Sequence, residues 1–275
     1  MVSHRVMPDV PRPVVEYLAR LLAGHRRAIG TRRGTRALGP FRQAVLVLRW
    51  FRDHACVHCL AQDAGISQAT GYRYLHEGID ALAAEAPGLA EVLQQCRRED
   101  LPFVILDGTL IRCDRVAGET DRGTDLWYAI RIKHFAGNAQ FLAAPDGTPL
   151  WVSDVEPGST HDLAAARIHA LPDLYRAARD GLPTLADIGY TGAGGGIHIP
   201  SRKHPDLPGD IGISNQTYNK LLRHLRFPGE RAMAVLKQRR RTLQHITLSP
   251  SRIGAIAQAA LVLNNAWQRS LRKPQ

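Results

Sequence analysis

The sequence is poor in cysteine and has no apolar run long enough to cross a membrane. Its four cysteines do not form a dense disulfide framework, which is typical of a protein from a reducing compartment. The longest apolar stretch, residues 253–263, is shorter than a bilayer-spanning helix requires. The first residues also lack the apolar segment of a signal peptide. We therefore expect a cytosolic protein that does not partner a membrane.

Acidic residues are scarce in the last quarter of the chain. Residues 200–275 contain 14 Lys and Arg but only three acids, Asp206, Asp210 and Glu230. Residues 1–199 contain 22 basic and 22 acidic side chains, so the whole net charge of +11 comes from the last quarter. A concentrated basic surface attracts polyanions, and the phosphate backbone of nucleic acids is the commonest of them. The alternative is a basic surface that serves solubility alone.

The spacing of hydrophobic residues, which make up 44% of the chain, changes near residue 100. Residues 1–40 indicate an arm with one short helix and a loop rich in Arg and Gly. Residues 41–100 have helical spacing. Residues 101–275 begin with short apolar runs that are typical of strands. We expect an α/β fold, with a mixed sheet flanked by helices after a helical N-terminal module.

Within residues 101–275 the pattern predicts individual elements. We expect strands at 103–106, continuing over 110–112, and at 126–135, 140–144, 150–152 and 184–186. Helices are expected over 160–179 and 216–271, with breaks near Pro228 and at 249–250. The segment 191–213 is rich in glycine and proline, so we expect a long loop there.

Residues 59–82 have the pattern of a helix-turn-helix. Gly65 would supply the tight turn, and Ser67 would cap the second helix. Polar and cationic side chains at the start of that helix could reach base edges and phosphates in a major groove. With Ser67, the expected DNA contacts here are Gln68, Thr70, Tyr72 and Arg73. A helical hairpin without a DNA partner is the alternative.

A small group of metal-ligand residue types precedes this pattern. It consists of His54, Cys56, His58 and Cys59. The Cys-x-x-Cys spacing has no second pair at zinc-finger distance, and Cys56 does not share a helical face with the two histidines. A zinc site remains one interpretation, but we expect buried thiols that bind no metal.

Two aspartates follow apolar runs and suggest a metal-dependent nuclease. Asp107 closes the run 103–106, and Asp187 closes the run 184–186. If the two strands lie side by side, both carboxylates emerge at one edge of the sheet, where hard oxygen ligands could hold divalent cations. The alternative for each aspartate alone is an ordinary turn residue.

The third acid is found by elimination, because Asp206 and Asp210 lie in the expected loop. Glu230 falls in the first turn of a helix that we expect to begin at Pro228. Its carboxylate could be a metal ligand facing DNA, or it could simply be favoured there by the helix dipole. As ligands, the three carboxyl groups should lie about 4–8 Å from one another.

At this point the sequence resembles a known family. The blocks 107–109, 157–162, 186–190 and 229–237 follow the order and spacing of the signature blocks of DDE superfamily transposases, the Harbinger-like enzymes of bacterial insertion sequences. The resemblance covers about residues 40–265, including the helix-turn-helix module. It implies a ribonuclease-H-like fold, which we expect over 101–275 after a DNA-binding domain at 41–100.

The resemblance also implies an activity. Asp107, Asp187 and Glu230 would hold two Mg²⁺ ions, with Mn²⁺ as a substitute. Water would cleave a phosphodiester at the transposon end, and the freed 3′-hydroxyl would attack target DNA. Pairing of two transposon ends implies a homodimer or a larger synaptic complex on DNA, in the bacterial cytoplasm and associated with the nucleoid. A catalytically inactive DNA-binding descendant and a metal-dependent endonuclease without strand transfer remain open.

Further residues receive supporting roles. His161 and Asp162 lie at the expected start of a helix, where they could position Asp107 or DNA or could simply stabilise the fold. The basic residues expected to contact phosphates are Arg231, Lys237 and Arg241. Lys237 and Arg241 follow Glu230 at helical spacing, so we place them on its face of the helix. A merely solvated face is the alternative.

Overall fold

The computed structural model describes residues 10–121, 123–202 and 212–272, and the chain divides into two units. Unit 1 contains Met1–Ala86, Leu236–His245 and Ala255–Gln275, and unit 2 contains Pro87–Val235 and Ile246–Gly254. These units differ from the divisions expected at residues 40 and 100, because the last segments belong largely with the N-terminal helices. The short helix η3 (Arg241–Gln244) shows why: its Thr242 hydroxyl donates to the backbone carbonyl of Trp50.

Unit 1 begins with helices α1 (Arg12–Ala28), α2 (Pro40–Asp53), α3 (Val57–Ala64) and α4 (Gln68–Ala83). Two glycines of α4 allow these helices to approach closely. A Cβ on Gly71 would lie 3.0 Å from Ala61 Cβ, and one on Gly78 would lie 2.4 Å from Val47 Cγ2. Residues 1–9, in the expected arm, lie outside the described residues.

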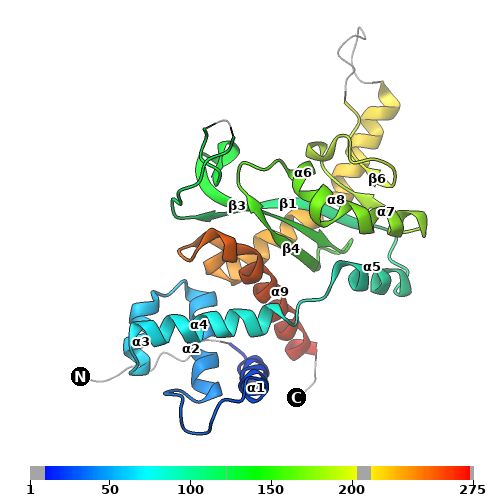
Figure 1. Cartoon of the computed structure of the whole chain (residues 1–275). Helices are drawn as coiled ribbons and strands as arrows, with labels where there is room; N and C mark the ends of the chain where they lie inside the picture. Colours follow the sequence, from blue (N-terminus) through cyan, green and yellow to red (C-terminus); the bar gives the residue numbers. More distant parts are fainter. Residues whose placement is uncertain (1–9, 122, 203–211, 273–275) are drawn as a thin grey trace. The chain divides into compact units, whose positions relative to one another are not determined.

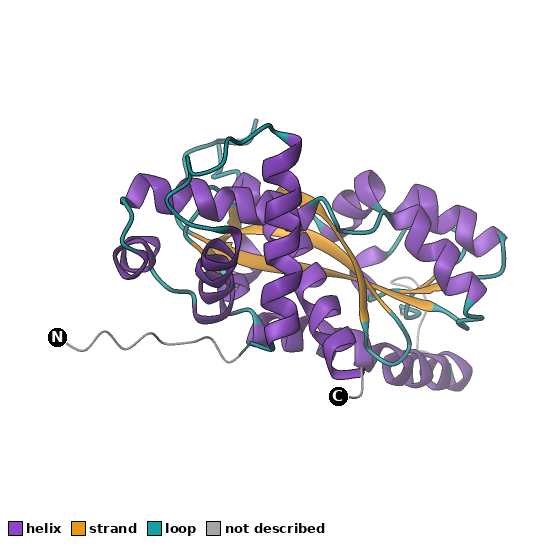
Figure 2. Ribbon diagram, turned by 90° about the horizontal axis from the view of Figure 1, so that it is seen from below, coloured by secondary structure: helices purple, strands orange, loops and turns teal. Residues whose placement is uncertain are grey.

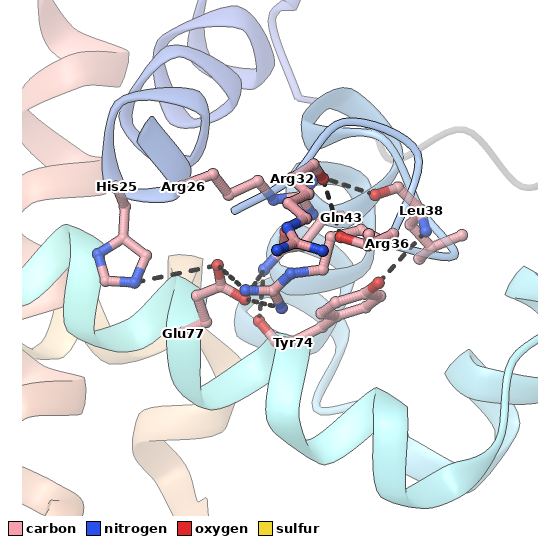
Figure 3. Close-up of polar contacts among 9 residues, drawn as sticks. His25, Arg26, Arg32, Arg36, Leu38, Gln43, Tyr74 and Glu77 are labelled. Atoms are coloured by element: carbon pink, nitrogen blue, oxygen red, sulfur yellow. Dashed lines mark hydrogen bonds and ion pairs between the residues drawn. The ribbon is translucent and has the colours of Figure 1, made fainter. Parts of the chain in front are cut away.

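A buried polar network fixes the loop between α1 and α2 (Figure 3). The Glu77 carboxylate, 8% exposed, pairs with Arg36 at 3.1 Å. Arg26 donates to the Leu38 carbonyl at 3.0 Å and to the Gln43 side chain. Because buried charges are stable only when paired, this network holds the Arg- and Gly-rich loop against α4.

Unit 2 begins with α5 (Leu89–Arg98), which precedes a mixed sheet drawn in orange in Figure 2. Among the described residues, the strands are β1 (Val104–Cys113), β2 (Tyr128–Ala129), β3 (His134–Ala143), β4 (Pro149–Pro157), β5 (Thr184–Leu185), β6 (Ile197–His198) and β7 (His245–Ile246). The path runs β2-β3-β1-β5-β6, and β4 pairs with β3. β1 is antiparallel to β3 and parallel to β5, so the expected mixed sheet is confirmed.

Several expected strand boundaries were wrong. β1 does not end at Asp107, because its antiparallel pairing with β3 is continuous from Ile105↔Ala143 to Arg112↔Ala136. The expected strand 126–135 is interrupted. Tyr128–Ala129 form the short strand β2, and the 3-10 helix η1 (Ile130–Ile132) follows directly. β6 lies inside the segment 191–213, which was expected to be all loop. Residues 203–211 of that segment lie outside the described residues.

Helices cover both faces of the sheet (Figure 1). On one face, α5, α6 (Asp162–His169) and α7 (Leu171–Arg179) share a buried apolar cluster with Leu106 and Leu142. On the other face, α8 (Ile213–Arg239) lies against β1, where a Cβ on Gly229 would meet Ile105 at 2.6 Å. The expected fold class, an α/β fold with a mixed sheet flanked by helices after a helical N-terminal region, is therefore confirmed.

The expected helix start at Pro228 was wrong. Pro228 lies inside α8, which runs unbroken from Ile213 to Arg239. Proline there cannot donate to a preceding carbonyl, but packing against the sheet at Gly229 and close contact of the Pro228 carbonyl with Gly147 hold the segment in place. The remaining elements are η2 (Ile188–Tyr190), η4 (Pro250–Arg252) and α9 (Ile253–Arg272). No helix among the described residues is long and apolar enough to cross a membrane.

Candidate active site

Asp107 lies in β1, and Asp187 lies just after the end of β5, the parallel neighbour of β1. Val104 pairs with Thr184 and Ile105 with Leu185, so β1 and β5 lie side by side as expected. Asp107 and Asp187 each follow two residues after the last of these pairs. The register therefore carries both carboxylates to the same region of the sheet, although Asp107 lies within its strand. Asp187 caps η2, and its Oδ1 accepts from the Gly189 N–H at 2.8 Å.

Asp107 is a buried carboxyl group with a perturbed pKa. Its side chain is 21% exposed, and burial raises its pKa to about 6. The nearby carboxylates of Asp187 and Asp162 raise the pKa further, whereas Arg226 and a hydrogen bond from the Gly108 N–H lower it. Burial is the largest of these effects, and Arg226 compensates it only in part.

Asp162 is anchored beside this pair at the first position of α6. Its Oδ1 accepts from Asn138 Nδ2 at 2.7 Å, and its Oδ2 pairs with Arg131 at 3.2 Å. His161 caps the helix, with its ring Nδ1 accepting from the Leu163 N–H at 3.4 Å. These contacts match the expected helix start and give both residues structural partners.

Gly108 explains how Asp162 comes so close to β1. A Cβ at residue 108 would lie 2.5 Å from Asp162 Oδ1 and 3.1 Å from Gln140 Nε2. A side chain there would displace the carboxylate, because real Cβ contacts do not reach that distance. The sequence analysis gave Gly108 no role beyond its place in the block 107–109, so its packing role was missed.

Glu230 reaches the same region through an arginine. Arg226 Nη2 lies 3.9 Å from Asp107 Oδ2 and 3.9 Å from Glu230 Oε1. The two carboxylate oxygens can therefore be no more than twice that distance apart. Arg226 precedes Glu230 by one turn of α8. Arg226 is 7% exposed, whereas the Glu230 side chain is 56% exposed. Arg226 was missed because the helix was expected to begin only at Pro228, which hid the i, i+4 spacing.

A buried tyrosine completes the surroundings of the aspartates. The Tyr190 hydroxyl donates to Gln140 Oε1 at 2.6 Å, and Gln140 Nε2 donates to Asn138 Oδ1 at 3.1 Å. Burial and the nearby carboxylates of Asp107 and Asp162 raise the pKa of Tyr190 well above its usual range. Tyr190 is therefore a neutral donor that links η2 to β3. Its place in the 186–190 block was the only sequence signal for it.

The three carboxylates have the ligand chemistry that a divalent cation requires, although their spacing among the described residues does not itself form a metal site. Asp107, Asp187 and Glu230 offer only carboxylate oxygens, which Mg²⁺ prefers as ligands. The raised pKa of Asp107 reflects repulsion and burial that a cation would relieve. Over residues 10–121, 123–202 and 212–272, no three His, Cys, Asp or Glu side chains are grouped closely enough to hold a metal ion. Arg226 lies within 3.9 Å of two of the three carboxylates.

In unit 1, the helix-turn-helix pattern folds as expected. α3 ends at Gly65, which takes a left-handed conformation with φ of 68°, and α4 begins after Ser67. The Ser67 hydroxyl accepts from the Thr70 N–H at 3.3 Å, so the N-cap is confirmed. Gln68, Tyr72 and Arg73 are exposed and Thr70 is half-buried. The start of α4 therefore presents polar side chains to solvent.

Unit 1 also contains a basic cavity of about 290 Å³. Its walls are Arg52, Asp53, Gln238, Arg239, Arg240, Arg241 and Trp267. Arg240 is 1% exposed, its guanidinium lies over the Trp267 ring, and its Nε has no hydrogen-bond partner. Burial and the charges of Arg239 and Arg52 lower the pKa of Arg240 to about 10. The charged guanidinium of Arg240 is therefore destabilised by burial and by repulsion from its neighbouring arginines. A bound anion would relieve both effects.

The expected helical alignment of Arg241 with Glu230 was wrong. α8 ends at Arg239, and Arg240 breaks the helix with a φ of −123° and a ψ of 80°. Arg241 therefore lies in η3 and is exposed at the basic cavity. Lys237 remains in α8 and is half-buried, and Arg231 is exposed.

The expectation of buried thiols at residues 56 and 59 was also wrong. Cys56 and Cys59 are exposed, whereas Cys96 and Cys113 are buried. The exposed pair lies at the first turn of α3, whose buried face is made instead by Val57, Leu60 and Ala61. Among the described residues, these cysteines do not form a group with two or more further His, Cys, Asp or Glu side chains that could hold a metal ion.

Two solved structures are similar to the chain. One is the crystal structure of a pre-cleavage Mos1 transpososome, with 13% identity, coverage of 97% of this chain and 100% of that chain, and a TM-score of 0.21. The other is the Mos1 transposase paired-end complex with the left transposon end, with 14% identity, the same coverage and a TM-score of 0.22. No curated protein matches the chain.

A family model for the DDE superfamily endonucleases matches residues 106–265. The matched segment includes Asp107, Asp187 and Glu230 and spans more than half of the sequence. This chain therefore belongs to the DDE superfamily endonucleases.

Proposed function

We propose that this protein is a DNA transposase that cleaves phosphodiesters at transposon ends and joins the freed 3′-hydroxyl to target DNA. The observation that carries the proposal is the carboxylate cluster within the matched segment. Asp107 lies in β1, Asp187 follows the adjacent parallel strand β5, and Arg226 lies 3.9 Å from both Asp107 and Glu230. The proposed element is a bacterial insertion sequence of the Harbinger-like group, acting on nucleoid DNA.

Asp107, Asp187 and Glu230 are the proposed ligands of two Mg²⁺ ions, which Mn²⁺ could replace. When bound, such ions supply the positive charge that favours a deprotonated nucleophile and a departing 3′-oxygen. The protein positions the ligands: the Gly108 N–H holds Asp107 at 2.8 Å and the Gly189 N–H holds Asp187 at 2.8 Å. Asp162 with His161 sets the start of α6 beside them.

DNA binding is proposed for two surfaces of unit 1. The first is the start of α4, with Ser67, Gln68, Thr70, Tyr72 and Arg73 facing a groove. The second is the basic cavity with Arg241, where buried arginine charge favours a backbone phosphate. Lys237 and Arg231 would add phosphate contacts along α8. Two transposon ends would be held by a homodimer or a larger complex.

The experiment uses purified full-length protein, Mg²⁺ and DNA carrying the inverted repeats that flank the gene. Wild-type protein should nick the repeat ends and yield joined products, and Asp107→Asn should yield neither. Glu91→Gln, which changes an exposed acid on α5, is the matched control and should retain both activities. Nicks without joined products would instead indicate an endonuclease. Equal behaviour of wild type and Asp107→Asn in binding, with no cleavage by either, would indicate an inactive DNA-binding descendant.

A further inference from the structure

The exposed cysteine pair has no place in the proposed reaction. Cys56 is the N-cap residue of α3, and Cys59 lies in the first turn of the same helix. Both are exposed, in contrast to Cys96 and Cys113. Exposed thiols one helical turn apart are accessible to small molecules and to each other.

The start of α3 makes the two thiols unequal. Hydrogen bonding from the backbone amides of Cys59 and His58, and from the Cys59 thiol, favours the thiolate of Cys56 and lowers its pKa. The same interaction, with the charges of Cys56 and Asp63, raises the pKa of Cys59. This is the asymmetry of a nucleophilic thiol with a neighbouring resolving thiol.

The other two cysteines provide an internal contrast. Burial, together with Glu99 for one and Asp114 for the other, raises the pKa of Cys96 and of Cys113 to about 11. Because the thiolate is the reactive form, both should be inert in the folded protein.

We propose that Cys56 and Cys59 form a reversible dithiol–disulfide couple that exchanges with low-molecular-weight disulfides and thiols. The Cys56 thiolate attacks one sulfur of the small disulfide, which forms a mixed disulfide and releases one small thiolate. Cys59 then loses its proton to solvent and attacks the Cys56 sulfur, which forms the Cys56–Cys59 bond and releases the second small thiolate. Two cysteine thiols are oxidised, and one small disulfide is reduced to two thiols.

The local structure makes this couple reversible. Because the start of α3 stabilises the Cys56 thiolate, it favours the reduced form and makes the disulfide easier to reduce. The bond would close only one turn of one helix, so the apolar face of α3, formed by Val57, Leu60 and Ala61, stays in place. The couple therefore differs from a structural disulfide.

The test incubates reduced full-length protein with oxidised glutathione at neutral pH, quenches with acid, and alkylates with N-ethylmaleimide after unfolding. In the peptide map, Cys56 and Cys59 should resist alkylation and share a peptide lighter by a pair of hydrogen atoms. Cys96 and Cys113 should be fully alkylated. Dithiothreitol should restore alkylation of the exposed pair. Free thiols at Cys56 and Cys59 after oxidation would overturn the proposal.

Two variants assign the roles of the pair. Cys59→Ser should accumulate glutathione on Cys56, because no resolving thiol remains. Cys56→Ser should leave Cys59 reacting with glutathione disulfide about tenfold more slowly than Cys56 does in Cys59→Ser. Circular dichroism checks that both variants are folded. Wild-type protein that retains glutathione as strongly as Cys59→Ser, or equal rates in the two variants, would contradict the assigned asymmetry.

Discussion

The buried Asp107 carboxyl should destabilise the folded protein at neutral pH, so replacing it should increase stability. Its pKa is raised from an ordinary 3.8 to about 6. That difference corresponds to roughly 3 kcal/mol when the group is ionised in the folded state. Asparagine has nearly the same shape and carries no charge. We expect the free energy of unfolding of Asp107→Asn to be about 3 kcal/mol higher than that of wild type at pH 8 in the presence of EDTA.

The gain should depend on pH in one direction. A carboxyl with a raised pKa binds its proton more tightly in the folded state than in the unfolded state, so wild-type stability falls as the pH rises from about 3.8 to about 6. As the pH falls through about 3.8, the carboxyl becomes protonated in the unfolded state as well, and the variant should lose most of its advantage. Above about pH 6 the advantage should be constant.

Urea unfolding of wild type and variant at pH 4 and pH 8, followed by fluorescence and circular dichroism, measures this difference. Asp63→Asn is a suitable control, because Asp63 is 56% exposed and pairs with Arg49 at the surface. Its effect should remain within about 0.5 kcal/mol at both pH values. An Asp107→Asn variant that is no more stable than wild type at pH 8 would refute the reasoning about buried charge.

Other substitutions test separate features. Gly108→Ala should abolish cleavage and destabilise the fold by more than about 1 kcal/mol, because the new Cβ would meet the Asp162 carboxylate. Gly88→Ala is the control and should retain activity in the same assays, because a Cβ there would meet no atom within 4 Å. Ser67→Ala should cost about 1 kcal/mol in thermal unfolding through loss of the N-cap. Arg241→Gln should weaken DNA binding across sequences and reduce the salt dependence by about one phosphate contact in fluorescence anisotropy. Cleavage at low Mg²⁺ should fall as the pH drops through about 6, because Asp107 must ionise to hold a cation.

The sequence could predict the parts of the site that depend on local patterns. Apolar runs located β1 and β5, and the block around Asp162 located the start of α6. The helix-turn-helix could be predicted because its signals are local. Gly65 forms a left-handed turn at the end of α3, and Ser67 caps the start of α4. Such features need no knowledge of distant contacts.

The missed features all depend on contacts between distant segments. The continuation of the first strand over 110–112 was expected, but the strand does not close at Asp107, because β3 pairs with it without a break from Ile105 to Arg112. α8 continues through Pro228 because Gly229 packs on Ile105. This continuation places Arg226 one turn before Glu230, so an error in one helix boundary concealed the arginine closest to the site.

The charges around Asp107 argue for a cation beyond the arginine already present. Arg226 lies 3.9 Å from Asp107 and from Glu230, but burial of Asp107, with the charges of Asp187 and Asp162, still raises the pKa of Asp107 to about 6. Asp187 adds a further negative charge to the same cluster. A phosphodiester approaching these carboxylates would be repelled, since DNA is itself a polyanion. The cluster can therefore act on DNA only when added positive charge reverses the local field, which is the role that divalent cations would fill in the proposed reaction.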